Sequence, residues 1–544
     1  MISDLKLFRG NTLAELVFRG WPCSQKILMV TDSSLDFGPG GFGLSEFVGI
    51  VTGAGHTVST AHRNGFGPTT IPGAFNFATA ATAVTTKNYD QLWLFGFNTT
   101  PLTAAERTTI ANFMSAGGGV FATGDHATIG AGMGTNIPRV RSMRNWATIP
   151  MVDPMRHDTV VHPGVDGIKQ FDDQADHFPQ QIYPVFFSNG GPSNNPATWS
   201  VHPVLRHPSG AVDYLPDHPH ESECLAPTPV AGNFAGVEEW PAPTGGGPRI
   251  PAQVVAISIS AGRFITDTLK PPVSPRCFGA ISAYDGDAAN VGRIVCDATW
   301  HHFVNVNLNG SGGTPDTTGA PREGMYVLGA PTPEYLKIQR YFLNTVRWLA
   351  PKGRRTCYPW VVTAAVRFDL EIRELQLPEP HPCPWDPLIR IGLVAEEALT
   401  RYWGPGALAE VVDDILAGTD AAPQLTGLLK GRRFARGDEQ DVLTDSSLLP
   451  LQDMRRAVFG SIVNLFAREL PEDEAKLAKV LRGTNDKRAN ELLAEGVRGA
   501  EKSIGEHLQR AFETTRGQLQ NLVAPKDESG QPRGRGRKTP SRRR

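Results

Sequence analysis

The feature that most constrains the fold is an alternation of short apolar segments with helical patterns over the first 350 residues. Residues 26–34 (KILMVTDSS), 91–98 and 119–126 have the pattern of buried strands, and a Gly-opened helix is expected at 40–55. This alternation is typical of a mostly parallel sheet with helices on both faces. We therefore predict an α/β domain over residues 1–350.

Further segments complete the pattern. Thr103 is followed three positions later by Glu106, which is the spacing of a capping box at the start of a helix. A run of glycines at 117–119 is expected to end that helix. The remaining predicted elements are strands at 56–63, 252–260, 277–284 and 292–300, and a closing amphipathic helix at 332–350.

The rest of the chain divides by composition. Residues 130–250 are rich in Pro, Asn, Asp, His and Gly, and we predict an ordered insertion over the edge of the sheet because this stretch is too long for an ordinary loop. The run CYPWVVTAAVRFDLEIREL fits strand or helix, so residues 351–385 are predicted to be a linker or extra strands. Residues 386–524 have helical patterns, and residues 525–544 are predicted to be a disordered basic tail.

Composition narrows the class of protein. The 544 residues hold 53 Lys plus Arg and 55 Asp plus Glu, no apolar run has the length of a membrane span, and the N-terminus lacks the apolar core of a signal peptide. We therefore expect a cytoplasmic protein without membrane association. The six cysteines lack CxxC spacing, so reduced thiols are expected rather than a zinc ribbon or a disulfide framework.

Polar residues stand at the ends of three predicted strands. Asp32 follows the first, Asp125 and His126 follow the strand at 119–124, and His301 and His302 follow the strand at 292–300. The carboxyl ends of parallel strands meet at one edge of a sheet, where open α/β folds bind ligands. Carboxylates and imidazoles there can hold a divalent metal or act as acid and base on a polar substrate. One of the two adjacent histidines is expected to point into the core or sideways.

The insertion carries a second group of such residues. Ten of the 14 histidines lie between His126 and His302, and the densest segment is DHPHESE. Its His218 and His220 share one face of an extended strand, and with Glu221 they are the predicted ligands of a divalent metal, Zn or Mn. The alternative is a polar surface loop without a metal.

Other motifs are less specific. The turn GPGGFG at 38–43 fits neither the dinucleotide fingerprint nor the P-loop, so it is either a tight turn or a phosphate cradle at the next helix. The sequence has no GxSxG motif, and Cys296 lies inside a predicted buried strand, which favours a core residue over a nucleophile.

The order of these motifs resembles the class I glutamine amidotransferase-like superfamily, particularly its ThuA-like branch, over residues 25–350. The resemblance rests on the Gly-rich turn after the first strand, on GGGVFATGDHATIGAGM and GRIVCDATWHH, and on a helix ending NTVRWLA. It implies a flavodoxin-like, mostly parallel sheet with helices on both faces, followed here by an insertion and a helical region outside the family pattern.

The resemblance also bears on the reaction. Amidotransferases carry a nucleophilic Cys in the elbow where this chain has Gly124-Asp125-His126, which implies that Cys-dependent glutaminase activity is absent. The ThuA-like branch also lacks the Cys, has a Gly-His that Trp300-His301 resembles, and is associated with sugar metabolism.

Two functions follow as hypotheses. The first is a hydrolase- or lyase-like enzyme acting on a small polar or carbohydrate-like substrate through Asp125, His126, His301 and His302, with or without a metal. The alternative is a non-catalytic scaffold whose C-terminal helices bind a protein partner or a second copy of the chain. The basic tail at 525–544, with a local charge of +6 from eight Lys or Arg and two acids, also allows binding to nucleic acid or an acidic partner.

Overall fold

The computed structural model describes residues 23–79, 84–125, 128–146, 180–188, 199–216, 222–260, 276–312, 324–355, 357–367, 369–375, 384–419, 421–423, 425, 429, 451–469 and 486–523.

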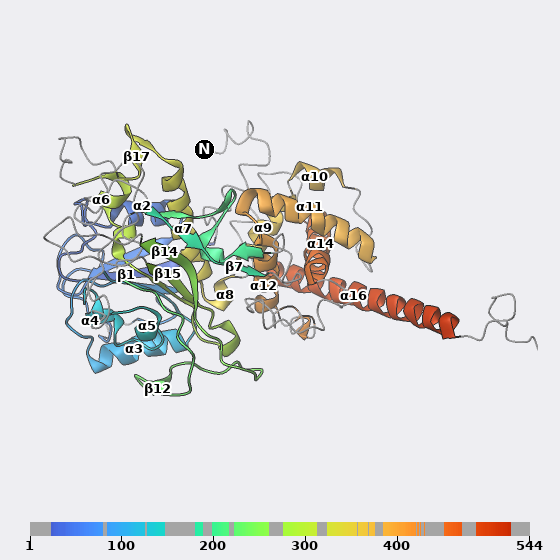
Figure 1. The fold of residues 1–544 in the computed structure, drawn as a ribbon, viewed down its shortest axis with the longest axis horizontal. Helices are drawn as coiled ribbons and strands as arrows, with labels where there is room; N and C mark the ends of the chain where they lie inside the picture. The colour runs from blue at the N-terminus through green and yellow to red at the C-terminus, as the bar shows by residue number, and fades with distance from the viewer. Residues whose placement is uncertain are drawn as a thin grey trace, which may run out of the picture.

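An eight-stranded sheet forms the centre of the first 350 residues (Figure 1). Its strands are, in spatial order, β2 (Thr57–His62), β1 (Lys26–Thr31), β3 (Gln91–Phe95), β4 (Gly119–Thr123), β16 (Ile294–Asp297), β15 (Arg276–Tyr284), β14 (Gln253–Ser260) and β6 (Tyr183–Pro184). The first five are parallel, and each of the last three is antiparallel to the strand before it. The predicted α/β fold with a mostly parallel sheet is therefore confirmed.

Helices cover both faces of this sheet. Met29 and Trp93 pack on one face against α2 (Ser45–Gly53) and α7 (Pro333–Trp348). The opposite face is covered by helices α3 (Ala104–Ser115), α4 (Ala131–Gly134) and α5 (Val140–Met143). In β1 and β3, alternate residues enter the two layers, which explains why these strands are continuous apolar runs in the sequence.

The capping box at the start of α3 is present. The Thr103 hydroxyl accepts a hydrogen bond from the Glu106 amide at 3.3 Å, and the Glu106 carboxylate accepts one from the Thr103 amide at 2.9 Å. This reciprocal pair satisfies two backbone donors that the first turn of a helix leaves free.

The insertion reaches both a face and the far edge of the sheet, since α4 and α5 at its start cover a face. Its strand β6 pairs with β14 and becomes the edge strand. The other described pieces are short: β5 (Gln180–Gln181), β7 (Phe186–Ser188), β8 (Trp199–Val201), η4 (Pro203–Leu205), β9 (Arg206–His207), β10 (Gly210–Ala211), β11 (Tyr214–Leu215), β12 (Asn233–Phe234) and β13 (Val237–Glu238). The short helix η5 (Asp287–Ala289) lies between β15 and β16. The chain then runs from β16 to α7 through η6 (Trp300–His302), α6 (Asn305–Asn309), β17 (Tyr326–Val327) and β18 (Ala330–Pro331).

The described residues of the segment 351–375 lie mostly in helices, so the extra strands allowed by the sequence are not found there. The described elements there are α8 (Lys352–Arg355), α9 (Cys357–Arg367) and α10 (Leu370–Glu374). The run WVVT in α9 has strand propensity, but Trp360, Val361 and Val362 are buried in the core of the helical region, and burial outweighs the propensity. That region continues with α11 (Trp385–Trp403), α12 (Ala407–Gly418), α14 (Leu451–Glu469) and α16 (Asp486–Val523).

Ion pairs join the helical region to the α/β domain. Glu410 of α12 is buried and pairs with Arg206 of the insertion and with Arg347 of α7, the latter at 2.6 Å. Arg355 pairs with Asp287 of the first domain and, at 3.4 Å, with Asp414 of α12. Arg206, Glu410, Arg355 and Asp414 are buried and depend on their partners for compensation, whereas Arg347 and Asp287 are partly exposed.

A disulfide joins Cys23, just before β1, to Cys357 at the start of α9. The expectation that all six cysteines are reduced thiols is therefore wrong for this pair. Its members are 334 residues apart, and sequence spacing alone does not reveal a pairing over such a distance. Cys224 and Cys296 are buried free thiols, and burial raises the pKa of Cys296 to about 12, which agrees with the predicted core role.

Among the residues that the structure describes, no helix has both the length and the apolar character that crossing a bilayer requires.

Candidate active site

Asp125 and His301 meet at the carboxyl edge of the sheet. Asp125 follows β4, and His301 lies in η6, which follows the adjacent parallel strand β16. The distance from Asp125 Oδ2 to His301 Nε2 is 3.6 Å. The strand order therefore brings together two residues that are 176 positions apart in the sequence, as the strand-end argument predicts.

The Asp125 side chain is held from the neighbouring strand end. The Thr299 hydroxyl donates a hydrogen bond to Asp125 Oδ1 at 3.0 Å. The Arg144 guanidinium donates to the Asp125 carbonyl oxygen at 2.8 Å and to the Ala298 carbonyl oxygen at 2.7 Å, so one side chain links the loops after β4 and β16. Burial lowers the pKa of Arg144. Asp125 itself is only 1% exposed.

His301 lies at the more open side of the pair, among aromatic rings. Its Nδ1 is 3.3 Å from Asn307 Oδ1, and because an amide oxygen only accepts, this contact places a proton on Nδ1. The imidazole stacks on Trp300 with ring centroids 4.3 Å apart, and the edge of Phe42 approaches it at 6.1 Å. The side chain keeps 9% of its surface exposed, which is the open side of an otherwise buried pair.

The distance within the pair has a chemical meaning. At 3.6 Å, His301 Nε2 and Asp125 Oδ2 are beyond direct hydrogen-bond length but close enough for a proton to move between them after a small shift or through water. Two ligands of a tetrahedral zinc ion would be about 3.4 Å apart, given bonds of about 2.1 Å. The pair therefore fits either acid/base chemistry or two positions of a metal site.

His302 is buried in the core and pairs with Asp297, as expected for one of the two histidines. Its Nδ1 is 2.6 Å from Asp297 Oδ1, and Asp297 Oδ2 accepts a hydrogen bond from the Tyr341 hydroxyl at 2.6 Å. His302 and Asp297 are fully buried, and burial together with Asp297 raises the pKa of Tyr341. This group links η6 to helix α7 beneath the edge of the sheet.

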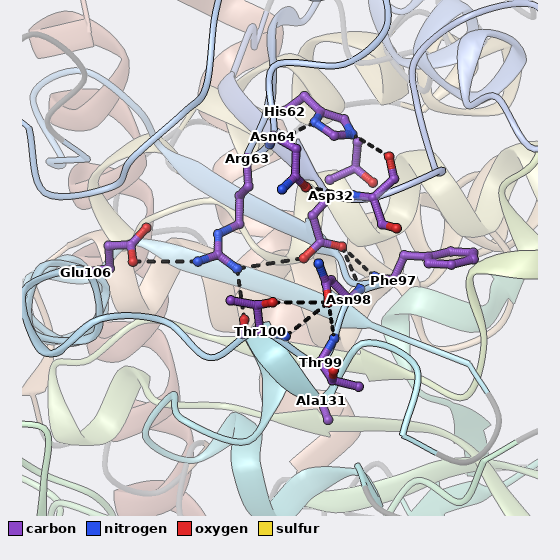
Figure 2. Close-up of polar contacts among 12 residues, drawn as sticks. Asp32, His62, Arg63, Asn64, Phe97, Asn98, Thr99, Thr100, Glu106 and Ala131 are labelled. Carbon is purple, nitrogen blue, oxygen red and sulfur yellow. Dashed lines mark hydrogen bonds and ion pairs between the residues drawn. The ribbon is translucent and has the colours of Figure 1, made fainter.

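Asp32 makes its contacts with a different loop (Figure 2). Its Oδ1 accepts hydrogen bonds from the backbone amides of Phe97 and Asn98, at 2.7 and 2.8 Å. Arg63 lies between Asp32 Oδ2 at 3.7 Å and Glu106 Oε2 at 3.6 Å. Asp32 thus ties the loop after β1 to the loop after β3, and it reaches the site only indirectly, because the Phe97 ring stacks on Trp300 at 5.6 Å.

His62, at the end of β2, is a neutral histidine in the same cluster. Its Nδ1 accepts hydrogen bonds from the amides of Asn64 and Phe66, at 3.0 and 3.1 Å. Nε2 therefore carries the proton and donates to the Ser33 carbonyl oxygen at 3.2 Å. Burial lowers the pKa of His62, which agrees with an uncharged ring.

The turn GPGGFG is a tight turn that a side chain of the chain itself caps. Asn305 Oδ1 accepts a hydrogen bond from the Glu46 amide at 2.9 Å, at the start of α2, and its Nδ2 donates to the carbonyl oxygens of Gly38 and Gly40. A Cβ at Gly43 would lie 1.9 Å from the Gly38 oxygen, so glycine is needed there. Asn305 occupies the place where a phosphate would bind in the cradle alternative.

Four predicted site residues, His126, His218, His220 and Glu221, lie outside the described residues. In the part of the chain that the structure describes, no group of three His, Cys, Asp or Glu side chains is arranged to hold a metal. The metal ligands named from the sequence therefore stay a prediction.

Sequence reasoning missed Arg144 and Asn305. Arg144 follows no strand and belongs to no motif, since it acts on backbone oxygens that only the folded chain brings together. Asn305 lies four residues after His301, and its partners are about 260 positions earlier, in the Gly-rich turn and α2. The two residues between His302 and Asn305 are the apolar Phe303 and Val304, and they give no sign of the role of Asn305.

No protein-family model matches the sequence, and a search of curated proteins finds no match.

Proposed function

We propose that the chain is a hydrolase- or lyase-like enzyme for a small polar substrate, with Asp125 and His301 as its acid/base pair. The observation that carries this proposal is the 3.6 Å approach of Asp125 Oδ2 to His301 Nε2 at the carboxyl edge of the sheet. The resemblance to the ThuA-like branch of the amidotransferase-like superfamily makes carbohydrates the first substrates to test. The missing elbow Cys keeps glutaminase chemistry out of the proposal.

The pair has the groups that a proton-transfer step needs. With the Nδ1 proton directed at Asn307, His301 Nε2 would be the atom that takes a proton from a water or a substrate hydroxyl. The Asp125 carboxylate then stabilises the imidazolium that forms, and His301 returns the proton to the leaving group. Thr299 and Arg144 keep Asp125 in position during this exchange.

A metal-assisted version uses the same two residues as ligands. The separation of 3.6 Å is close to the spacing of two ligands on zinc, and His126 or the residues His218, His220 and Glu221 would supply the others. Bound zinc would lower the pKa of a coordinated water toward 7, which is the chemistry that a hydrolase needs.

The decisive experiment compares His301→Gln and Asp125→Asn with the wild type on a panel of glycosides, sugar esters and lactones. Each variant should lower kcat/KM by about 10²-fold or more, because acid/base groups contribute factors of that size. His207→Gln is the matched control: it also removes a histidine ring, but from a residue whose ring bonds Ser209 in the insertion. Wild-type activity in both site variants would refute the proposal.

Metal content is measured separately. Metal analysis of the purified protein and its thermal stability with added Zn²⁺ or Mn²⁺ are compared between wild type and a His218→Ala, His220→Ala double variant. No bound metal and no thermal shift would remove the metal-assisted version and leave the acid/base version in place.

A further inference from the structure

Helix α16 extends well beyond the bundle that it helps to form (Figure 1). Its 38 residues span about 57 Å at 1.5 Å per residue. The first half is anchored, since Leu493 and Val497 are fully buried and Ile504 is 5% exposed. In the second half two large apolar side chains are exposed, Phe512 at 62% and Leu519 at 55%.

One apolar stripe runs along both halves. Its members recur at intervals of four, three and four residues, the spacing that keeps side chains on one face of a straight helix. The buried members are Leu493, Val497, Ala500 and Ile504, and the stripe continues as Leu508, Ala511, Thr515 and Leu519 with Phe512 beside it. The Thr515 hydroxyl is bonded to the Ala511 carbonyl oxygen at 2.9 Å, which satisfies the polar atom of this side chain. The exposed half therefore repeats the face that the bundle covers in the first half.

An uncovered extension of this kind is costly. Residues 505–523 include Gly505 and Gly517. Each glycine lowers the stability of an exposed helix by about 1 kcal/mol relative to Ala. Most of the stability of a helix in a protein comes from the packing of its apolar face, and the stripe lacks that packing beyond Leu508. The two glycines and the unpacked stripe both favour a partner for the extension.

The charges on the extension suit a second copy of the same chain. Residues 505–523 hold two acids, Glu506 and Glu513, and two bases, Arg510 and Arg516, so two copies do not repel each other through net charge. At 100° per residue, Glu506, Arg510 and Glu513 project on the side opposite the stripe, and Arg516 stands at its flank. The stripe itself is free of charge from Leu508 to Leu519.

We propose that α16 pairs with α16 of a second copy of this chain, in antiparallel orientation, through the stripe from Leu508 to Leu519. A two-fold axis that places Leu508 opposite Leu519 also places Phe512 opposite Thr515. Leu508 is half-buried at the edge of the bundle, so the partner's Leu519 would complete its cover. The same axis brings Arg516 to the level of the partner's Ala511, within a turn of the partner's Phe512 and Glu513.

The test uses the full chain in analytical ultracentrifugation over a range of concentrations. The wild type should sediment as a dimer that dissociates on dilution, and a Phe512→Glu, Leu519→Glu double variant should be a monomer at concentrations where the wild type is dimeric. Thr514→Glu with Gln520→Glu is the matched control, since it adds the same charge at exposed positions off the stripe and should leave the dimer intact.

Three results would overturn the pairing. They are a wild type that stays monomeric at all concentrations, a dimer that survives both stripe substitutions, and equal dissociation in the stripe and control variants. A monomeric wild type would assign the stripe to a different protein. Circular dichroism at matched concentrations separates loss of pairing from loss of folding, because a folded monomer keeps the helix content of the bundle.

Discussion

Adjacent residues in this chain have opposite roles. His301 faces Asp125 at the edge of the sheet, while His302 is fully buried against Asp297. The 3₁₀ turn of η6 directs consecutive side chains to different sides, so one short segment both supplies a reactive group and anchors itself to α7. A substitution at His302 is expected to act on stability, and one at His301 on activity.

A buried histidine predicts how stability depends on pH. Burial lowers the pKa of His56 to about 4, whereas the unfolded chain has the ordinary value near 6.5. Between these values the unfolded state binds a proton that the folded state does not, so stability falls as the pH is lowered. From pH 7.5 to pH 5 the loss from this residue should be about 2 kcal/mol.

Urea unfolding at the two pH values checks this expectation. His56→Asn keeps a side-chain acceptor for the Gln25 amide, which donates to His56 Nδ1 at 3.2 Å, but removes the titrating group. The variant should lose less stability than the wild type between pH 7.5 and pH 5. Equal losses in the two proteins would contradict the assigned cause.

At the scale of elements, the Gly-rich turn, α2 and α6 depend on Asn305. This side chain is 1% exposed and bonds both the start of α2 and the carbonyl oxygens of the turn. Asn305→Ala should lower the free energy of unfolding by about 2 kcal/mol, because it leaves buried donors and acceptors without partners. Asn309→Ala in the same short helix, where the side chain is half-buried, should cost less than half as much in the same denaturant titration. Similar costs at the two positions would show that Asn305 has no special role.

The elements that the sequence predicted well are those whose signals are local. The capping box of Thr103 and Glu106 and the apolar runs of the strands need only neighbouring residues, and the structure contains all of them. The run at 357–367 could not be assigned, because its helical form depends on packing against α14, about a hundred residues later. For the site, strand ends indicated Asp125 and His301, whereas Arg144 acts on backbone oxygens that no local pattern reveals.

At the scale of the whole molecule, the disulfide and the buried ion pairs around Glu410 hold the two regions together. Cross-linking residues so far apart restricts the unfolded chain, and we expect Cys357→Ser to lower the free energy of unfolding by about 2–4 kcal/mol. Cys277→Ser, at an exposed free thiol, is the control and should change little.

Thiol titration of the denatured protein checks the bond directly. The wild type should show two more reactive thiols after reduction than before it, and Cys357→Ser should remove that difference. Equal thiol counts before and after reduction would show that the bond is absent in solution.

The position of the disulfide also affects how the chain is made. Cys23 leaves the ribosome 334 residues before Cys357, and at about 5–20 residues per second this interval is roughly 17–67 s. During that time β1 can pair with β2 and β3, whose residues follow soon after, while its neighbouring thiol has no partner. Cys23 therefore stays a reduced thiol beside the forming sheet during this part of synthesis. It can react with an oxidant, or form a disulfide with a cysteine other than Cys357, until the first helices of the second region have been made.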